Sequence, residues 1–230
     1  MVAAMHRPRQ VRPPIIRRRR VSRGELIADG IVHALGIVIA IAAGSALLAF
    51  AAGSAGAGEY VALLFYLSSL VTALSVSCAY NLWPASPVKW VLRRADHAGI
   101  DLLIAGTDTP FLVQLDDRAA ALTMLAVVWG GAVLGIAVKL FLPGRFDRLS
   151  IGFYLAIGWS GTAVLRSLGE ALPQSTIWLI AAGGVASSLG VIFFVWQQLR
   201  FQSALWHGFV VTGATLHLAA MGDLMIFARL

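Results

Sequence analysis

The chain of 230 residues is 59% hydrophobic and only 13% charged, whereas about a quarter of the residues in a soluble domain carry charge. These proportions exclude a soluble globular domain and predict an integral membrane protein. The net charge of +7 comes from the first 23 residues, which hold eight arginines and no acidic residue. Positive charge confined to one arm beside an apolar helix is typical of a cytoplasmic retention signal, so no nucleic-acid partner is expected.

The chain divides into an arm and one membrane domain. Residues 1–23 are predicted to form a disordered cytoplasmic arm that contacts anionic lipid headgroups, and residues 24–230 to form the domain. A cleaved signal peptide would have an apolar region of about 7 to 15 residues. The first apolar run extends from Ile27 to about Ala52 and is therefore interpreted as a spanning helix. The single Cys78 excludes an internal disulfide.

Seven runs are long enough to span a membrane, which takes about 20 mostly apolar residues. They lie near residues 27–52, 60–83, 98–115, 120–142, 149–168, 176–197 and 204–227. The connections are short and contain helix breakers, for example in PASP and LPGRFDR. The sequence therefore predicts an all-α fold, a single bundle of seven transmembrane helices.

The distribution of basic residues predicts the orientation, because short loops rich in Lys and Arg stay in the cytoplasm. If the arm is inside, the cytoplasmic segments also hold Lys89, Arg93, Arg94, Lys139, Arg145, Arg148 and Arg200. The opposite side then holds only Arg118, Arg166 and Arg229. We expect a multi-pass protein of the cell inner (plasma) membrane with its N-terminus in the cytoplasm and its C-terminus outside. This orientation is opposite to that of rhodopsin-like proteins, and the last helix lacks the lysine that retinal requires.

Polar residues gather near the predicted cytoplasmic face, where they are candidates for a functional site because ionisable groups inside a membrane are costly. They are Glu25, Asp29 and His33 in the first helix, Ser77 and Asn81 in the second, Asp96, His97 and Asp101 in the third, and Ser203 and His207 in the last. Asp29 and His33 form either a structural pair or part of this site. Asp101 and Asp108 share one face of the third helix, which alone predicts no particular chemistry.

The last helix contains two histidines with different expected roles. His207 belongs to the cytoplasmic cluster, whereas His217 lies ten residues further on, about 15 Å along a helix. The two histidines therefore cannot share one metal ion. We expect His217 to be a neutral side chain that is hydrogen-bonded to a neighbouring helix.

The run SCAYNLWPASPVKWVLRRADHAGIDLLIAGTDTPF resembles the signature region of the hemolysin III family, the bacterial branch of the progestin and adipoQ receptors that includes the adiponectin receptors. GELIADGIVHALG, FYLAIGW and ALWHGFVVTGATLH resemble further segments of that family, so the resemblance covers nearly all of residues 22–227. It implies a zinc ion near the cytoplasmic face. The implied ligands are three histidines from an S-x-x-x-H motif on helix 2 and an H-x-x-x-H motif on helix 7, and an aspartate holds the zinc-bound water.

This chain departs from that pattern at two of the three ligands. The helix 2 motif falls on Ser77 to Asn81, where asparagine replaces histidine, and the helix 7 motif falls on Ser203 to His207, where serine replaces the first histidine. The aspartate matches Asp96. Asparagine and serine oxygens replace imidazole nitrogen poorly as zinc ligands, so we expect no tight zinc site of the family type. A rescued site remains an alternative, with further ligands from Asp29, His33, His97 or Asp101.

Three functions follow from this resemblance, and membrane lipids are the expected partners. The favoured one is a non-enzymatic membrane protein with a degenerate zinc site, serving lipid sensing, membrane homeostasis or signalling. The first alternative is a zinc-dependent hydrolase of amide lipids such as ceramides, with Asp96 as base, Ser77 as a transition-state donor and His207 as the metal ligand. The second is a pore-forming cytolysin, for which the fourth to sixth helices offer little, since Gly131 and Gly135 predict tight packing.

Overall fold

The computed structural model describes residues 21–142, 144 and 146–226, and within these ranges the chain is all-helical, as predicted. Most of the predicted arm and the last four residues lie outside the described part. The elements are α1 (Arg23–Ser54), α2 (Ala57–Leu82), α3 (Pro87–Leu112), α4 (Arg118–Phe141), α5 (Asp147–Gly158), the 3-10 helix η1 (Ser160–Val164), α6 (Leu165–Ala171), α7 (Gln174–Val195) and α8 (Gln202–Met225). Because α5, η1 and α6 together form the fifth segment, the bundle has seven segments.

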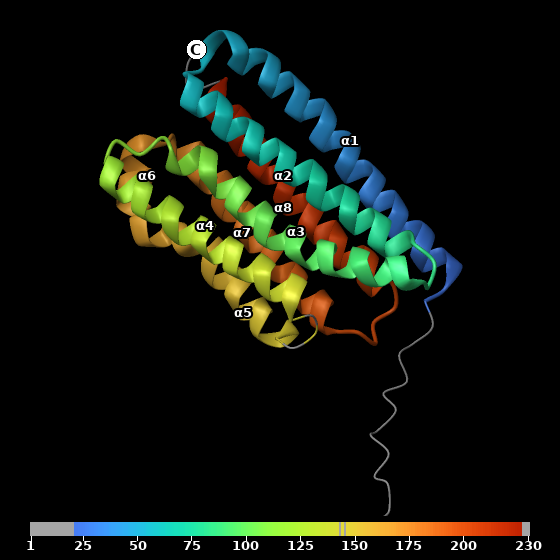
Figure 1. Cartoon of the computed structure of the whole chain (residues 1–230). Helices are drawn as coiled ribbons and strands as arrows, with labels where there is room; N and C mark the ends of the chain where they lie inside the picture. The colour runs from blue at the N-terminus through green and yellow to red at the C-terminus, as the bar shows by residue number, and fades with distance from the viewer. Residues whose placement is uncertain (1–20, 143, 145, 227–230) are drawn as a thin grey trace, which may run out of the picture.

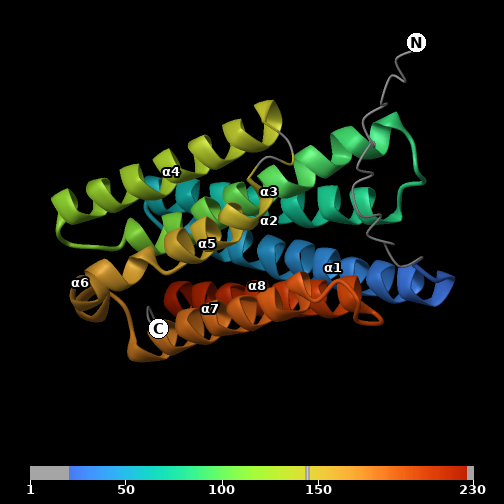
Figure 2. The ribbon, with the colours of Figure 1, turned by 90° about the horizontal axis from the view of Figure 1, so that it is seen from below.

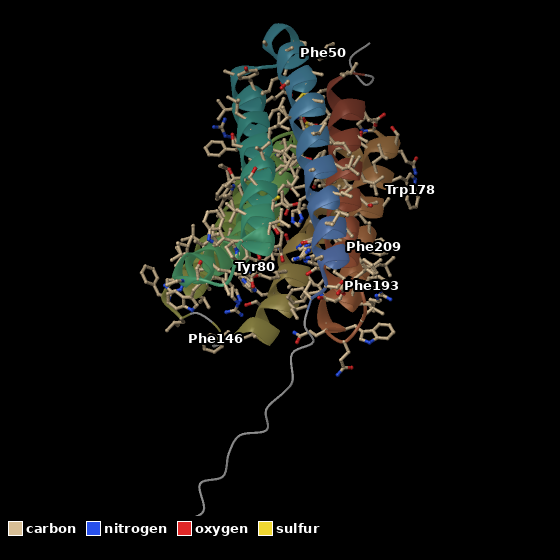
Figure 3. All side chains as sticks on the ribbon, turned by 90° about the vertical axis from the view of Figure 1, so that its right-hand side faces the viewer. Phe50, Tyr80, Phe146, Trp178, Phe193 and Phe209 are labelled. Atoms are coloured by element: carbon tan, nitrogen blue, oxygen red, sulfur yellow. The ribbon has the colours of Figure 1, made fainter. Side chains whose placement is uncertain are left out.

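Among the described residues, five helices are long and apolar enough to cross a membrane, namely α1, α2, α4, α7 and α8. Many large apolar side chains point outward from the bundle, including Trp178 at 67% exposure, and Figure 3 shows Trp178 projecting from α7. Soluble monomers rarely expose so much apolar surface, and lipid is the natural cover for it. The direction in which the bundle crosses the membrane stays a prediction.

The helices pack into a closed ring. Contacts join α1 to α2, α2 to α3, α3 to α4, α7 to α8, and α8 back to α1, with α5 set against α3, α4 and α7 (Figures 1 and 2). Consequently the start of α1, the end of α2, the start of α3 and the start of α8 share one end of the bundle, at the right of Figure 1. This is the end that carries the predicted polar cluster.

α3 begins eleven residues before the apolar run that was predicted to start near residue 98. Ser86 caps the helix by accepting a hydrogen bond from the Lys89 backbone N–H at 3.3 Å, and Pro87 occupies the first helical position. Proline is favoured there because the first helical N–H groups have no partner within the helix. Counting apolar residues detects the apolar part of a helix and misses a polar extension of this kind.

The fifth segment is interrupted, although its apolar run predicted one helix over residues 149–168. α5 ends at Gly158, and the chain continues as the 3-10 helix η1 before α6. The Thr162 hydroxyl donates to the Trp159 carbonyl oxygen at 2.7 Å, and the Thr162 backbone N–H bonds the same oxygen at 3.1 Å. Side chains that bond nearby carbonyl groups compete with regular helix formation, which accounts for the tighter turn.

Glycines permit the closest helix contacts, as predicted for Gly131 and Gly135. A Cβ atom at Gly131 would collide with Ile157 of α5, and one at Gly135 would collide with the carboxylate of Asp101 on α3. Between α1 and α8, a Cβ atom at Gly36 would lie 2.7 Å from Val211. Small residues at such positions let helix backbones approach in a membrane.

Replacing Gly131 by valine should destabilise the bundle by about 1–3 kcal/mol, because the added side chain overpacks the contact with α5. Gly130→Val is the matched control, since a Cβ atom at Gly130 meets nothing within 4 Å. Thermal unfolding of both variants in the same detergent, followed by circular dichroism, measures the difference. Equal midpoints for the two variants would contradict the packing assigned to Gly131.

Candidate functional site

Four side chains from three helices meet near one end of the bundle. Asp29 and His33 come from α1, Ser77 from α2 and His207 from α8, and the exposed fractions of Asp29, His33 and His207 are only 2%, 1% and 8%. Asp29 and His33 are four residues apart and therefore lie on the same helix face. That face turns inward because α8 packs closely against it at Gly36.

Asp29 anchors both histidines through their Nδ1 atoms. His207 Nδ1 lies 2.6 Å from Asp29 Oδ1, and His33 Nδ1 lies 2.9 Å from the backbone carbonyl oxygen of Asp29. The two imidazole rings lie against each other at an interplanar angle of 57°, with centroids 4.3 Å apart. Their remaining nitrogens converge on one hydroxyl, because Ser77 Oγ lies 3.1 Å from His33 Nε2 and 3.4 Å from His207 Nε2.

This convergence leaves more acceptors than donors. A carbonyl or carboxylate oxygen only accepts, so the Nδ1 atoms of His33 and His207 donate to Asp29, and in the neutral rings both Nε2 atoms are acceptors. Ser77 has a single hydroxyl proton and can satisfy only one of them. Histidines that bind metals typically donate the other ring N–H to a carboxylate or carbonyl oxygen in this way.

Asp29, His33 and His207 form a group that could hold a metal ion. One ligand atom from each residue can be chosen so that all of these atoms lie within 4.8 Å of one another. Imidazole nitrogens are suitable zinc ligands, and Asp29, which already accepts from His207 Nδ1, holds the two Nε2 atoms toward Ser77. The buried residues present thus fit a metal, although with a different ligand set from the three histidines that the family resemblance implies.

The two substituted ligand positions have other roles. The Asn81 amide donates to the Ser77 backbone oxygen at 2.9 Å and lies 3.4 Å from Ser77 Oγ, so it holds the serine in place. Ser203 lies one turn before His207 and makes no side-chain hydrogen bond within the described part of the chain. Neither residue supplies the imidazole nitrogen that a three-histidine site requires.

Of the predicted site residues on α3, Asp96 lies near the cluster, whereas His97 and Asp101 face other parts of the bundle. Asp96 lies close enough to His33 to interact with it electrostatically. His97 turns away, with its Nδ1 donating to the Arg93 carbonyl oxygen at 2.6 Å and its ring beside Tyr80. Asp101 faces Gly135 of α4. Of the four residues that the sequence offered for a rescued site, the structure therefore brings together only Asp29 and His33.

Glu25 fixes the relative positions of α1 and α8 beside the site. Its carboxylate accepts from the Ser22 backbone N–H at 2.8 Å and from the Phe201 backbone N–H at 2.9 Å. Phe201 is the left-handed residue that starts α8, with φ of 60°. The sequence places Glu25 in a capping box with Ser22, but nothing local indicates the bond to Phe201.

His217 has the surroundings expected from the sequence. Its ring lies close to the backbone of Ile180 on α7. Its ring also lies against Gly183, where a Cβ atom would come within 2.7 Å of Nε2. This histidine joins α7 to α8 and lies outside the cluster around Ser77.

Comparisons with known proteins identify relatives over most of the chain. The family model described as haemolysin-III related matches residues 26–218. The chain is 35% identical over 191 residues to the hemolysin-3 homolog of Bacillus subtilis (strain 168), covering 83% of this chain and 89% of that protein. It is 34% identical over 192 residues to hemolysin-3 of Bacillus cereus, covering 84% and 88%. It is also 29% identical over 203 residues to the monocyte to macrophage differentiation factor of Homo sapiens, covering 86% and 83%.

Asp29→Ala should destabilise the protein by about 1–3 kcal/mol, because it leaves the buried Nδ1 of His207 without an acceptor. Asp29→Asn keeps an oxygen at the same position and should lose less stability than Asp29→Ala. Thermal unfolding of both variants in detergent tests this order. An alanine variant as stable as the wild type would show that the Asp29–His207 bond does not hold α1 to α8.

Proposed function

Because the chain belongs to the haemolysin III family, we propose that it is a multi-pass protein of the cell inner membrane that holds a divalent metal, zinc first, between the Nε2 atoms of His33 and His207, with Asp29 fixing both rings from the Nδ1 side. One observation carries this proposal. The Nε2 atoms of two buried histidines converge on Ser77 Oγ, while their Nδ1 atoms are anchored on Asp29. With both rings neutral, this arrangement supplies a pair of lone pairs that one hydroxyl proton cannot satisfy, and a cation would satisfy both.

The reaction to test first is hydrolysis of an amide lipid. A zinc ion bound here would act as a Lewis acid and would activate a water molecule. Among the chain's own residues, Asp96 carries a carboxylate near His33 that could accept a proton. Ser77 has a hydroxyl held in place by Asn81. These groups support the hydrolase interpretation that the sequence offered as an alternative.

The second candidate is the metal-free protein that the sequence favours, acting in lipid sensing, membrane homeostasis or signalling. It is supported by Asn81, which stands at a family ligand position and donates to Ser77 instead of binding a metal. In this interpretation Asp29, His33, Ser77 and His207 form a hydrogen-bonded network that joins α1, α2 and α8. The same residues would then stabilise the fold without catalysing a reaction.

Metal content of the detergent-purified protein, measured by elemental mass spectrometry after dialysis against zinc, distinguishes the two candidates. We expect about one zinc per chain in the wild type and almost complete loss in His33→Ala, because the single remaining histidine would not retain zinc. His97→Ala is the matched control, since His97 lies on α3 and bonds to Arg93 rather than to the cluster. It should keep its zinc.

A wild type without zinc would overturn the metal proposal, and so would equal zinc contents in the wild type and His33→Ala. The double variant Asn81→His, Ser203→His then tests whether only the family ligands, and not the geometry of the family site, have been lost. If it gains zinc, the bundle keeps the geometry of the family site without its ligands, and the metal-free function stands. If zinc is present in the wild type, release of fatty acid from ceramide is the next assay.

A further inference from the structure

A second set of buried polar groups, Asp101 and Asp108, lies on α3 on a different helix face from Asp96. Asp101 and Asp108 are seven residues apart, which places them on one helix face about 10 Å from each other. Asp101 is 2% exposed. Both carboxylate oxygens of Asp101, and Oδ2 of Asp108, are buried without a hydrogen-bond partner within the described residues. The metal proposal uses neither aspartate.

α4 is shaped around the first of these carboxylates. Gly135 faces Asp101, and any Cβ atom at this position would collide with the carboxylate group. One turn further along, Lys139 is 5% exposed, interacts electrostatically with Asp101 and donates to the hydroxyl of Ser150 on α5. Lys139 also lies 5.9 Å from the ring of Tyr154 on α5. Because α4 ends at Phe141, these groups connect Asp101 with one end of the bundle.

The interruption of the fifth segment lies beside the same face of α3. Ala105, between the two aspartates, is fully buried in a cluster with Ile157 of α5, and Val164 of η1 packs against that cluster. Within η1, the Ser160 hydroxyl oxygen is buried without a hydrogen-bond partner. Irregular backbone at membrane depth is tolerated where protein buries it or where it lines a polar cavity. Interrupted helices also form ion sites in many transporters.

Physical chemistry limits what the two carboxylates can do. A charged carboxylate in an apolar interior is strongly unfavourable unless it is paired or holds a proton or a cation. Chains of Asp, Glu and His inside membrane bundles are typical of proton relays. Asp108 lies four residues before the end of α3, about 6 Å from the opposite end of the helix. Lys139, Asp101 and Asp108 therefore extend over most of the length of the bundle.

We propose that Asp101 and Asp108 bind and release protons in turn, as two groups of a proton relay that runs along the contact of α3 with α4 and the interrupted fifth segment. A proton binds one oxygen of a carboxylate and another leaves from the same group, so that only O–H bonds form and break. Because Ala105 between the two aspartates is packed in an apolar cluster, the proton would cross this distance on water molecules that enter when the helices move apart. Within the described residues, Lys139 on α4 interacts electrostatically with Asp101, and Tyr154 on α5 lies beyond Lys139.

Liposomes that contain the purified protein and the pH-sensitive dye pyranine test this relay. A potassium diffusion potential set by valinomycin drives protons inward, and we expect the wild type to acidify the lumen faster than empty liposomes do. Asp101→Asn and Asp108→Asn should each reduce the rate to that of empty liposomes. Asp223→Asn is the matched control, because this membrane carboxylate already accepts hydrogen bonds from Ser175 and Thr176. It should keep the wild-type rate.

A wild type no faster than empty liposomes would overturn the relay, and so would wild-type rates in either Asp101→Asn or Asp108→Asn. Release of entrapped carboxyfluorescein by the wild type would also overturn it, since a route for large solutes is a pore. If a variant does not fold, dicyclohexylcarbodiimide, which modifies protonated carboxyl groups in membranes, replaces it. The reagent should modify Asp101 or Asp108 and stop the proton flux. It should leave the exposed Asp117 unmodified. Proton flux that continues unchanged after modification would contradict the relay.

Discussion

The hydrogen bond between Asp29 and His207 joins α1 to α8 and so closes the ring of helices. These residues lie 178 positions apart in the sequence, and their side chains meet at 2.6 Å. Lipid is as apolar as the helix surfaces, so close packing and polar bonds hold a membrane bundle together. Gly36 provides the close approach, and Glu25 ties the starts of both helices together. The candidate metal site exists because this junction turns His33 and His207 toward Ser77.

The same junction creates a candidate metal site although two of the ligand positions implied by the family resemblance are substituted. Ser77 keeps its position between two imidazole rings although one of those rings comes from α1 rather than from α2. Asn81 no longer offers a ring nitrogen but orients Ser77 from one turn away. In the proposed metal site a histidine of α1 takes the place of the one that the resemblance implies on α2, and α8 supplies His207 in either arrangement.

The sequence predicts what depends on local composition and misses what depends on packing. Seven apolar runs and a polar end follow from residue type and spacing, and the structure confirms the all-helical bundle. Spacing placed Asp29 and His33 on one face, but the direction of that face is set by α8. The interruption after Gly158 was missed because residues 153–165 are almost all apolar or small, and only the local bonds of Thr162 mark the change.

α3 separates two polar systems that would otherwise interfere. Asp96 lies near His33, whereas Asp101 faces Gly135 of α4, and five residues turn a helix by about 140° beyond one full turn. A divalent ion beside His33 would disfavour the binding of a proton by Asp101, and the different directions of Asp96 and Asp101 on α3 keep the two sites apart. The absence of a side chain at Gly135 of α4 leaves the space that the Asp101 carboxylate occupies. If position 101 held an apolar residue, a residue larger than glycine at position 135 could pack against it. The glycine at position 135 therefore fits the carboxylate of Asp101 rather than an ordinary apolar contact between α3 and α4.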